Sequence, residues 1–482
     1  MGEVFGEMKR HYHFVGIGGI GMGALASLLL AKGKIVSGSD LKENQVTEKL
    51  KAQGARIFVG HDARHMEGAD VVIYTSAVQE HNPELAAAKA RHVPVLQRAV
   101  LLAELMKSHT GITVAGAHGK TTTTSMIAGL LMKAGLNPTV AIGGIVNGSA
   151  CHAQLGGGEY FVAEVDESDG SFLHFAPKVS VITNIDYEHL DYYHNWENIL
   201  SAYRAFIHKT TPDGLVLVRG DDERLMRLVE ESGRSFKTFG FLPRHNITAR
   251  NIQFDHFHSR FECVIDGKSR GEVQLVIPGR HNVANALACI GTGLTLSIDF
   301  DVIRESLKEF QGVQRRFQVK GKIDNIWVIY DYAHHPTEIE ATLQTAQVVK
   351  RSGPGMEGER RLIAVFQPHR YSRLQALMDE FARSLTTADY LIVTDVYAAS
   401  EKPIEGISAE TLCDKIREKT EKPVFYVKKE NVVDDLLSAV HPGDFVMTLG
   451  AGDISSMTDH FVSALKESVE KKSKVKLEGI KV

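Results

Sequence analysis

Cysteine is scarce in this chain, which has four cysteines among 482 residues. They stand far apart, at Cys151, Cys263, Cys289 and Cys413, and no Cys-x-x-Cys pair occurs. This spacing argues against a disulfide framework and against a structural zinc site. We therefore expect reduced, structural thiols, as is usual in cytoplasmic proteins.

Long apolar runs and blocks of one charge are also missing. No run of 18 apolar residues occurs, so a membrane-spanning helix is not predicted. No basic block suggests a nucleic-acid partner, and the first ten residues carry charges where a secretory signal would be apolar. A net charge of −4 and 43% hydrophobic residues are typical of a globular protein. The length favours about three domains.

Among the motifs that the sequence does contain, the most informative is Val-Ala-Gly-Ala-His-Gly-Lys-Thr-Thr-Thr-Thr at 114–124. A β-branched run predicts a strand ending at Gly116, and the apolar spacing after Lys120 predicts a helix. The turn between them can point backbone N–H groups at an anion, Lys120 adds a positive charge, and Thr121 offers a hydroxyl to Mg²⁺. The pattern predicts a cradle for a nucleoside triphosphate. Since Val114 replaces the first Walker glycine, an ordinary strand–helix turn is the alternative.

A second glycine-rich turn, Gly-Ile-Gly-Gly-Ile-Gly-Met-Gly at 16–23, lies between a short strand and a helical run at 24–32. This order is typical of a dinucleotide-binding fold. Asp40 ends the next strand, at the sequence distance from the glycines that such a fold leads one to expect. One interpretation is a diphosphate on the helix N-terminus with a sugar or base near Asp40. The other is that the glycines only allow close packing of helix and strand.

Polar side chains follow neighbouring strands of the central region. Glu164 ends an apolar strand, and His189 comes shortly after the next one. Because the carboxyl ends of parallel strands share one edge of a sheet, these residues are expected beside Lys120 and Thr121. A carboxylate at that place can hold Mg²⁺, directly or through water. Each acid alone would more often cap a helix or face solvent, so the coincidence of the three strand ends favours a site.

Two further motifs leave alternatives open. His281 and Asn282 stand where a small-residue helix begins, so they either cap it or offer the amide of Asn282 to a purine. In the last third of the chain, Arg370 and Arg373 are spaced to share a helix face and grip an anion or carboxylate. Ordinary surface arginines are the other interpretation.

Taken together, these motifs resemble the Mur ligases, the ATP-dependent amino-acid-adding enzymes of peptidoglycan synthesis. The resembling segments cover nearly the whole chain, at 16–23, 38–40, 116–124, 163–172, 188–193, 281–286, 331–338 and 366–373. Ala117 departs from the threonine usual in the phosphate loop, with little expected loss because backbone groups bind the phosphate. The resemblance implies a three-domain α/β architecture. Its parts are a Rossmann-like UDP-sugar domain (1–108), a P-loop ATPase-like domain that binds ATP (109–313) and a Rossmann-like amino-acid domain (314–482).

Within the family, the motifs look like those of members that join L-alanine to the carboxylate of UDP-N-acetylmuramate through an acyl phosphate. The resemblance implies a cytoplasmic monomer or weak homodimer that uses ATP and Mg²⁺. The implied catalytic residues are Lys120, Glu164, His189, Arg316 and His334, and two Mg²⁺ ions are assigned to Thr121, Glu164 and His189. The implied nucleotide-binding residues are Gly116, His118, Gly119, Lys120, Thr121, Thr122, His281, Asn282 and Asp331. The implied substrate-binding residues are Gly18, Ile20, Gly21, Asp40, Ser76, Tyr332, Arg370 and Arg373.

One departure and three rivals bear on this assignment. Several Mur ligases carry a carbamylated lysine in the helix after the Glu-His-x-Asp motif, but no lysine stands near Phe206 or Ile207 here. That absence fits an alanine-adding enzyme. The rivals are a nicotinamide-dependent oxidoreductase fused to a nucleotide-binding module, a sensor without turnover, and a family ligase that adds glycine, serine or a peptide.

Overall fold

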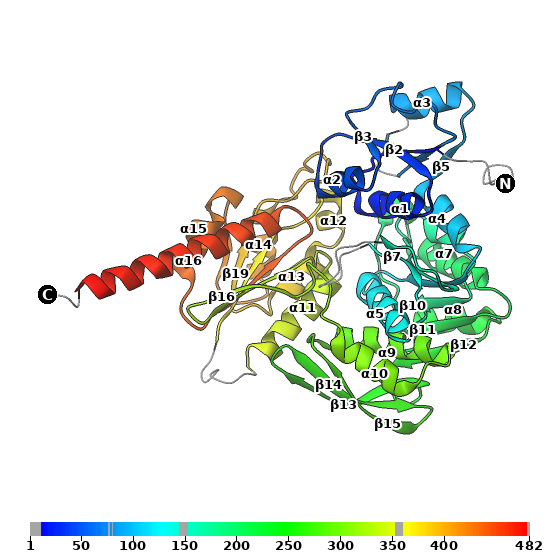
Figure 1. The fold of residues 1–482 in the computed structure, drawn as a ribbon. Coiled ribbons are helices and arrows are strands. Elements are labelled where there is room, and N and C mark those ends of the chain that lie inside the picture. Colours follow the sequence, from blue (N-terminus) through cyan, green and yellow to red (C-terminus); the bar gives the residue numbers. More distant parts are fainter. Residues whose placement is uncertain (1–10, 76–77, 80, 144–152, 352–359, 480–482) are drawn as a thin grey trace. The chain divides into compact units, whose positions relative to one another are not determined.

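The computed structural model describes residues 11–75, 78–79, 81–143, 153–351 and 360–479. Its strands form three sheets, and helices connect most of the parallel strands, so the predicted α/β class is confirmed (Figure 1). The chain divides into two compact units, the second of which contains 253–260, 276–281 and 314–482. The first contains the rest of the chain up to Val313.

The N-terminal sheet has five parallel strands in the order β3-β2-β1-β4-β5. The strands are β1 (His11–Val15), β2 (Ile35–Asp40), β3 (Arg56–Val59), β4 (Val71–Tyr74) and β5 (Val95–Gln97). The helices are α1 (Ile20–Ala31), α2 (Gln45–Ala52), α3 (Pro83–Ala90) and α4 (Arg98–Met106). Helices cover both faces of a parallel sheet, so its central strands read as continuous apolar runs. Strand β4 follows this rule, whereas β1 is almost fully buried although His11 and His13 interrupt its apolar residues.

The central sheet has ten strands in the order β15-β14-β13-β12-β11-β10-β6-β9-β7-β8. They are β6 (Thr110–Ala115), β7 (Thr139–Ala141), β8 (Ala153–Gln154), β9 (Tyr160–Glu164), β10 (Val179–Ile182), β11 (Leu215–Arg219), β12 (Phe236–Gly240), β13 (Ile247–Asp255), β14 (His258–Ile265) and β15 (Lys268–Leu275). The helical segments are α5 (Lys120–Lys133), η1 (Ser171–His174), α6 (Leu190–Tyr193), α7 (Trp196–Lys209), α8 (Glu223–Glu231), α9 (Arg280–Thr295) and α10 (Phe300–Glu309).

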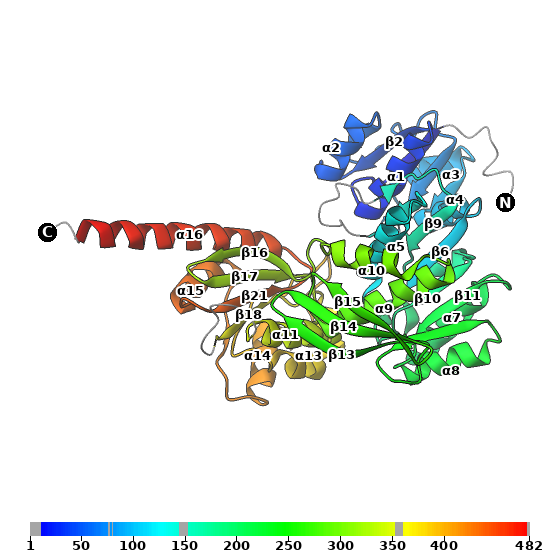
Figure 2. The same cartoon turned by 60° about the horizontal axis from the view of Figure 1, so that its bottom comes forward.

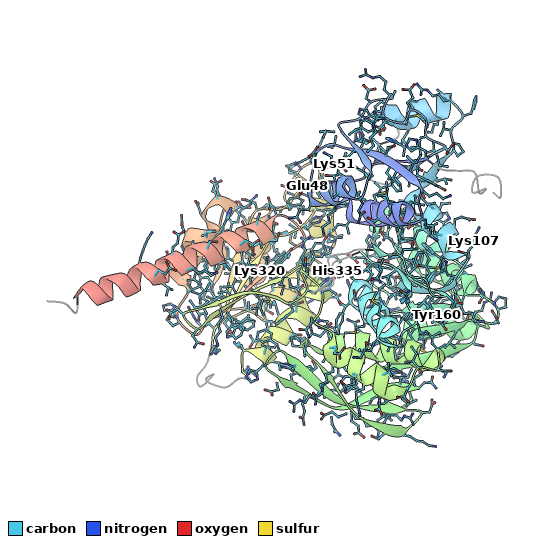
Figure 3. The ribbon with its side chains drawn as sticks, in the orientation of Figure 1. Glu48, Lys51, Lys107, Tyr160, Lys320 and His335 are labelled. Carbon is cyan, nitrogen blue, oxygen red and sulfur yellow. The ribbon has the colours of Figure 1, made fainter. Side chains whose placement is uncertain are left out.

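Strand order explains how the site of the central region is assembled. Strand β6 pairs in parallel with β10 on one side and with β9 on the other. The three strands therefore end at one edge of the sheet, as predicted from the sequence. Tyr160, labelled in Figure 3, begins β9, and Lys107 directly follows α4 in the N-terminal region.

The third sheet has six strands in the order β16-β17-β21-β18-β19-β20, of which only the pair β16–β17 is antiparallel. The strands are β16 (Gln318–Ile323), β17 (Ile326–Asp331), β18 (Leu362–Phe366), β19 (Tyr390–Val393), β20 (Val424–Tyr426) and β21 (Phe445–Leu449). The helical segments are α11 (Pro336–Val349), α12 (Tyr371–Ala376), α13 (Met378–Leu385), α14 (Ala409–Arg417), η2 (Lys429–Asn431), α15 (Val432–Ala439) and α16 (Ile454–Gly479). Helix α16 lies along β16 and β17, and separate apolar clusters line the two faces of the sheet (Figure 2).

Two expectations from composition concern membrane-spanning helices and the cysteines. Among the residues described, no helix combines the length and hydropathy needed to cross a bilayer. Cys263, Cys289 and Cys413 are buried and unpaired, and Cys151 lies outside the described residues.

A buried carboxylate organises the N-terminal sheet. Glu84, at the start of α3, is 0% exposed. It accepts a hydrogen bond from Ser39 at 2.5 Å, and His65 Nδ1 lies 3.0 Å away. Burial opposes its ionisation, but these hydrogen bonds, together with the neighbouring His13, lower the pKa of Glu84 to about 2.

We expect Glu84→Gln to be less thermally stable than the wild type at pH 7, and we expect this difference to disappear at low pH. The folded-state pKa lies below the ordinary value of 4.5. The carboxylate therefore stabilises the fold above pH 4.5, and its contribution disappears as the pH falls toward 2. Removing one partner of a buried hydrogen-bonded charge costs about 1–3 kcal/mol. Thermal unfolding of Glu84→Gln and of the exposed control Glu43→Gln between pH 7 and 3 tests this; a deficit that does not change with pH would contradict it.

Candidate functional site

The turn between β6 and α5 can be built only from glycine at two positions. Gly116 and Gly119 have φ values of +129° and +81°. A Cβ atom on Gly116 would lie 2.2 Å from Thr183 Oγ1, and one on Gly119 would lie 2.6 Å from Asn285 Oδ1. Both the left-handed backbone and the close approach therefore require glycine.

Residues that follow β10 hold this loop in place. The backbone N–H of His118 donates to Asn184 Oδ1 at 2.9 Å, and the Asn184 side chain donates back to the His118 carbonyl, also at 2.9 Å. Thr183 donates to the same carbonyl at 2.6 Å. The ring of His118 lies 2.8 Å from Asp186 Oδ2. The predicted nucleotide-binding His118 is thus held at the edge of the loop by three residues that were not among the predicted site residues.

Lys120 is folded back over the loop that precedes it. Its ammonium donates to the carbonyl of Gly116 at 2.7 Å and to Glu167 Oε1 at 2.7 Å. Burial opposes the charge, but the carboxylates of Glu167 and Asp166 outweigh this effect and raise the pKa of Lys120. Lys120 is therefore positively charged at neutral pH.

Two of the three predicted metal ligands contact each other, and the third contacts a carboxylate that was not predicted. Thr121 Oγ1 donates to Glu164 Oε1 at 2.9 Å, and the N–H of Gly143 donates to the other oxygen of Glu164 at 2.8 Å. His189 Nε2 lies 3.4 Å from Glu167 Oε1. Glu167 was not among the predicted site residues, although it stands three positions after Glu164 in the strand-end motif.

These side chains suit a divalent cation. Carboxylate and hydroxyl oxygens are the preferred ligands of Mg²⁺ and Mn²⁺, whereas imidazole is a common ligand of softer transition metals such as Fe²⁺ and Zn²⁺. Ligand atoms that share an octahedral ion with bonds of about 2.1 Å lie about 3 Å apart. The separations in the two pairs, 2.9 and 3.4 Å, are compatible with that geometry.

The N-terminus of α9 lies beside the phosphate loop. Thr123 Oγ1 donates to Asn285 Oδ1 at 3.2 Å, and Asn285 lies 3.3 Å from Asn282 Oδ1. Asn282 is buried, as is the loop residue Thr122. This arrangement places Asn282 close to the predicted nucleotide-binding loop. His281, the residue before it, instead lines a pocket of about 210 Å³ formed with the 278–280 segment, Phe254 and α11.

The glycine turn of the N-terminal sheet is tied to Asp40. The N–H of Gly18 donates to Asp40 Oδ2 at 2.8 Å, and Asn44 donates to the Gly18 carbonyl at 3.1 Å. A Cβ on Gly21 would lie 2.8 Å from Arg98 Nη1, which brings a guanidinium to the same turn. Ile20 is 40% exposed at the start of α1. Ser76 lies outside the described residues.

Glu338 joins two of the predicted catalytic residues of the third sheet. Its Oε1 atom lies 3.2 Å from Arg316 Nη1, and its Oε2 atom accepts the backbone N–H of His334 at 3.1 Å. Nearby, Asp331 accepts the backbone N–H groups of Phe317 and Ala333, each at 2.7 Å. Burial raises the pKa of Asp331 to about 6.

An aromatic and cationic cluster lies at the ends of β17 and β18. His369 stacks on Tyr397 with ring centroids 5.4 Å apart, and His334 meets His369 edge to face. Tyr332 packs against His334 in turn. Arg373 Nη1 lies 3.4 Å from His369 Nδ1. Burial and the neighbouring cations lower the pKa of His369 to about 4, so its imidazole is neutral at pH 7.

We expect Arg370→Lys and Arg373→Lys to weaken the use of carboxylate substrates and to leave ATP use almost unchanged. A guanidinium binds a carboxylate through paired hydrogen bonds, which a lysine cannot reproduce. The KM for the amino acid or the sugar substrate should rise about tenfold or more, as expected for the loss of one charge-assisted hydrogen bond. Steady-state kinetics with Arg383→Lys, an exposed arginine on α13, as the control tests this. A change confined to the ATP KM would assign these arginines to the nucleotide.

Comparisons with known proteins cover almost all of the chain. Three family descriptions match consecutive segments: the Mur ligase family catalytic domain at 11–110, the Mur ligase middle domain at 114–293, and the Mur ligase glutamate ligase domain at 315–452. A UDP-N-acetylmuramate–L-alanine ligase from Geotalea uraniireducens is 45% identical over 464 residues, which are 96% of this chain and 99% of that protein.

Solved structures agree with this result. The UDP-N-acetylmuramate–alanine ligase of Thermotoga maritima superposes with a TM-score of 0.79 at 33% identity, covering 95% of this chain and 99% of that one. The MurF ligase of the same organism, solved in complex with ADP, shares the fold with a TM-score of 0.63 at 17% identity, covering 98% of this chain and all of that one. The strand-end motifs, the three matched segments and the near full-length relatives point the same way: this chain belongs to the Mur ligase family.

Proposed function

We propose that this protein is an ATP-dependent ligase that joins L-alanine to the carboxylate of UDP-N-acetylmuramate in peptidoglycan synthesis. The observation that carries the proposal is the 45% identity, over 96% of the chain, to a relative named for that reaction. The phosphate loop with its lysine, flanked by two carboxylates and an imidazole, supplies what the chemistry requires.

The reaction has two steps. A carboxylate oxygen of the sugar attacks the γ-phosphorus of ATP, the bond to ADP breaks, and an acyl phosphate forms. The amine of alanine then attacks the carbonyl carbon, loses a proton, and phosphate leaves. Activation is needed because an oxide ion is a very poor leaving group at neutral pH.

The residues of the central region act on the first step. Two anions must approach each other, and the charge of Lys120 offsets their repulsion as negative charge moves toward ADP. Gly116 and Gly119 let backbone N–H groups face the phosphates. Thr121, Glu164 and His189 would hold Mg²⁺, which would neutralise further phosphate charge.

The N-terminal and C-terminal regions bind the other substrates. Gly18, Gly21 and Asp40 fit the diphosphate and ribose of the UDP-sugar, since a glycine turn at a helix N-terminus is an anion site. We assign Arg370 and Arg373 to carboxylates, and His334 to the proton lost by the amine. The ligands are small molecules, and we infer a cytoplasmic monomer or weak homodimer.

Phosphate release from ATP tests the proposal. With UDP-N-acetylmuramate and Mg²⁺, release should require an amino acid and be fastest with L-alanine, slower with glycine and L-serine. Faster release with a peptide or another amino acid would overturn the alanine assignment. Calorimetry with UDP-N-acetylmuramate and with NAD(P)H tests the oxidoreductase rival, which predicts tight binding of the nicotinamide cofactor that is lost in Gly18→Val.

A further inference from the structure

The turn that precedes α12 is held in a backbone conformation that its residues do not favour. It follows β18, and Arg370, the last residue before the helix, has φ +71° and ψ 134°. A residue with a Cβ atom rarely adopts this conformation, and glycine is the usual choice there. Such strain persists only where the surrounding structure fixes the backbone, and it is concentrated at functional sites.

The segment 397–401 provides the contacts that fix this turn. The backbone N–H of Arg370 donates to the carbonyl of Tyr397 at 2.9 Å, and the N–H of Tyr397 donates to the carbonyl of Pro368 at 2.8 Å. The ring of Tyr397 also stacks on His369. The two segments are therefore joined by backbone and side-chain contacts, although α12, α13 and β19 separate them in the sequence.

The same segment ends in a second strained turn, which presents Glu401. The N–H of Glu401 donates to the carbonyl of Ala398 at 3.0 Å and closes a four-residue turn. The two central residues, Ala399 and Ser400, have φ values of +48° and +73°. Positive φ at both central positions is the pattern of a type I′ turn, in which glycine, asparagine or aspartate is usual. Strained backbone thus lies on both sides of the contact between the two segments.

Glu401 binds the first turn of α12 with both of its oxygens, and neither the sequence motifs nor the comparisons assign it a role. Oε2 accepts the backbone N–H of Ser372 at 3.0 Å, and Oε1 accepts the Ser372 hydroxyl at 2.6 Å. Burial opposes the charge of Glu401, but the hydrogen bonds from Ser372 and the charge of Arg370 outweigh this effect and lower its pKa. The carboxylate is therefore ionised at neutral pH, and hydrogen bonds to an ionised acceptor are the stronger kind.

A negative charge close to a site for carboxylates needs a physical reason, because it repels the substrate. Ser372 stands between Arg370 and Arg373, so the hydrogen bonds from Ser372 fix the start of the helix that carries Arg373 and directly follows Arg370. A guanidinium forms paired hydrogen bonds with a carboxylate only when its plane is correctly oriented. A fixed orientation of the two arginines is the benefit that offsets the repulsion.

We propose that Glu401 is a positioning residue that, through Ser372, orients Arg370 and Arg373 for one substrate carboxylate. Glu401 itself does not contact the substrate. The inference rests on the proposed function in taking these two arginines as the carboxylate-binding groups.

Steady-state phosphate release measures this role. Glu401→Ala removes both hydrogen bonds to Ser372, and we expect it to raise one KM about tenfold or more, that of whichever substrate, L-alanine or the muramoyl sugar, is affected by Arg370→Lys. The ATP KM should change less than twofold. Glu401→Gln keeps one acceptor in the same place and should recover much of the loss. Glu405→Ala, which removes an exposed acid four residues further on, should leave every KM unchanged.

Two simpler roles for Glu401 predict different results. A carboxylate that only repelled the substrate would give a lower KM in both Glu401→Ala and Glu401→Gln, and one that only stabilised the fold would leave the KM unchanged below the unfolding temperature. Either result would overturn the proposal. Ser372→Ala provides a second variant should Glu401→Ala unfold. It should raise the same KM by a smaller factor, and the double variant should lose little more than Glu401→Ala alone; fully additive losses would contradict a shared role.

Hydrogen exchange tests the same contact without any substrate. The amides of Leu374 and Leu377 donate to the carbonyls of Arg370 and Arg373 and close the turn of α12. Peptides that span 370–377 should exchange about tenfold faster in Glu401→Ala than in Glu405→Ala, because local opening is easier when the contact is lost. Equal exchange would overturn the proposal. Failure of the ligase assignment would appear differently, as a wild type that releases no phosphate with the sugar and L-alanine.

Discussion

Replacing Lys120 with alanine is expected to lower kcat/KM by about a thousandfold or more. The lysine is the only cationic side chain within the phosphate loop sequence, and its ammonium is bound by the Gly116 carbonyl and Glu167 in the structure. Phosphoryl transfer to a carboxylate brings negative groups together, so a charge at this place acts mainly on the transition state. The loss should therefore appear mainly as a fall in kcat, with a smaller change in the ATP KM.

The matched control is Lys133→Ala at the other end of α5. Lys133 is 41% exposed and pairs with Glu309, so its loss should change the rate less than twofold, since an exposed ion pair contributes about 0–1 kcal/mol to stability and does not touch the loop. Phosphate release at saturating substrates and thermal unfolding should be measured for both variants. A Lys120→Ala protein with nearly normal turnover would remove this loop from the mechanism.

Local sequence patterns predicted the elements that carry the site. The loop at 116–121 was recognisable because a left-handed backbone and a close approach to Thr183 leave room for glycine alone. The end of β9 at Glu164 was recognisable because a buried strand reads as an unbroken apolar run. Parallel pairing of β6 with β9 and β10 then placed the two features at one edge. Family membership and activity, both predicted from these motifs, agree with the comparisons.

Partners far apart in sequence could not be predicted in the same way. Asn285 contacts Thr123 across 162 positions, and nothing in the local pattern of either residue marks the contact. Glu167 was visible as an acid after a strand, but its burial against Lys120 depends on the fold of the 166–193 segment around it. Glu338 lies on the first turn of α11, where acidic residues are common because they interact favourably with the helix dipole. Its presence there therefore gave no indication of its contacts with Arg316 and His334.

Glu164→Gln is expected to raise the Mg²⁺ concentration needed for half-maximal rate by about 10- to 100-fold. Glu164 accepts a hydrogen bond on each oxygen, from Thr121 and from the N–H of Gly143. Glutamine keeps the shape of the side chain but replaces one acceptor with an NH₂ group and removes the negative charge that a hard cation prefers. Turnover at fixed, low Mg²⁺ should therefore fall by a similar factor and recover in part as Mg²⁺ is raised.

Phosphate release as a function of Mg²⁺, at constant ATP and saturating sugar and alanine, measures the effect. Glu231→Gln, an acid 60% exposed on α8, is the control for loss of one charge and should not shift the curve. His189→Ala removes a ligand of different chemistry. If the imidazole is the weaker ligand, His189→Ala should raise the Mn²⁺ concentration needed for half-maximal rate less than Glu164→Gln does. An unchanged Mg²⁺ requirement in both Glu164→Gln and His189→Ala would contradict the metal assignment. A shift in Glu164→Gln alone would restrict the metal site to the pair formed by Thr121 and Glu164, because those two side chains share a hydrogen bond that His189 does not join.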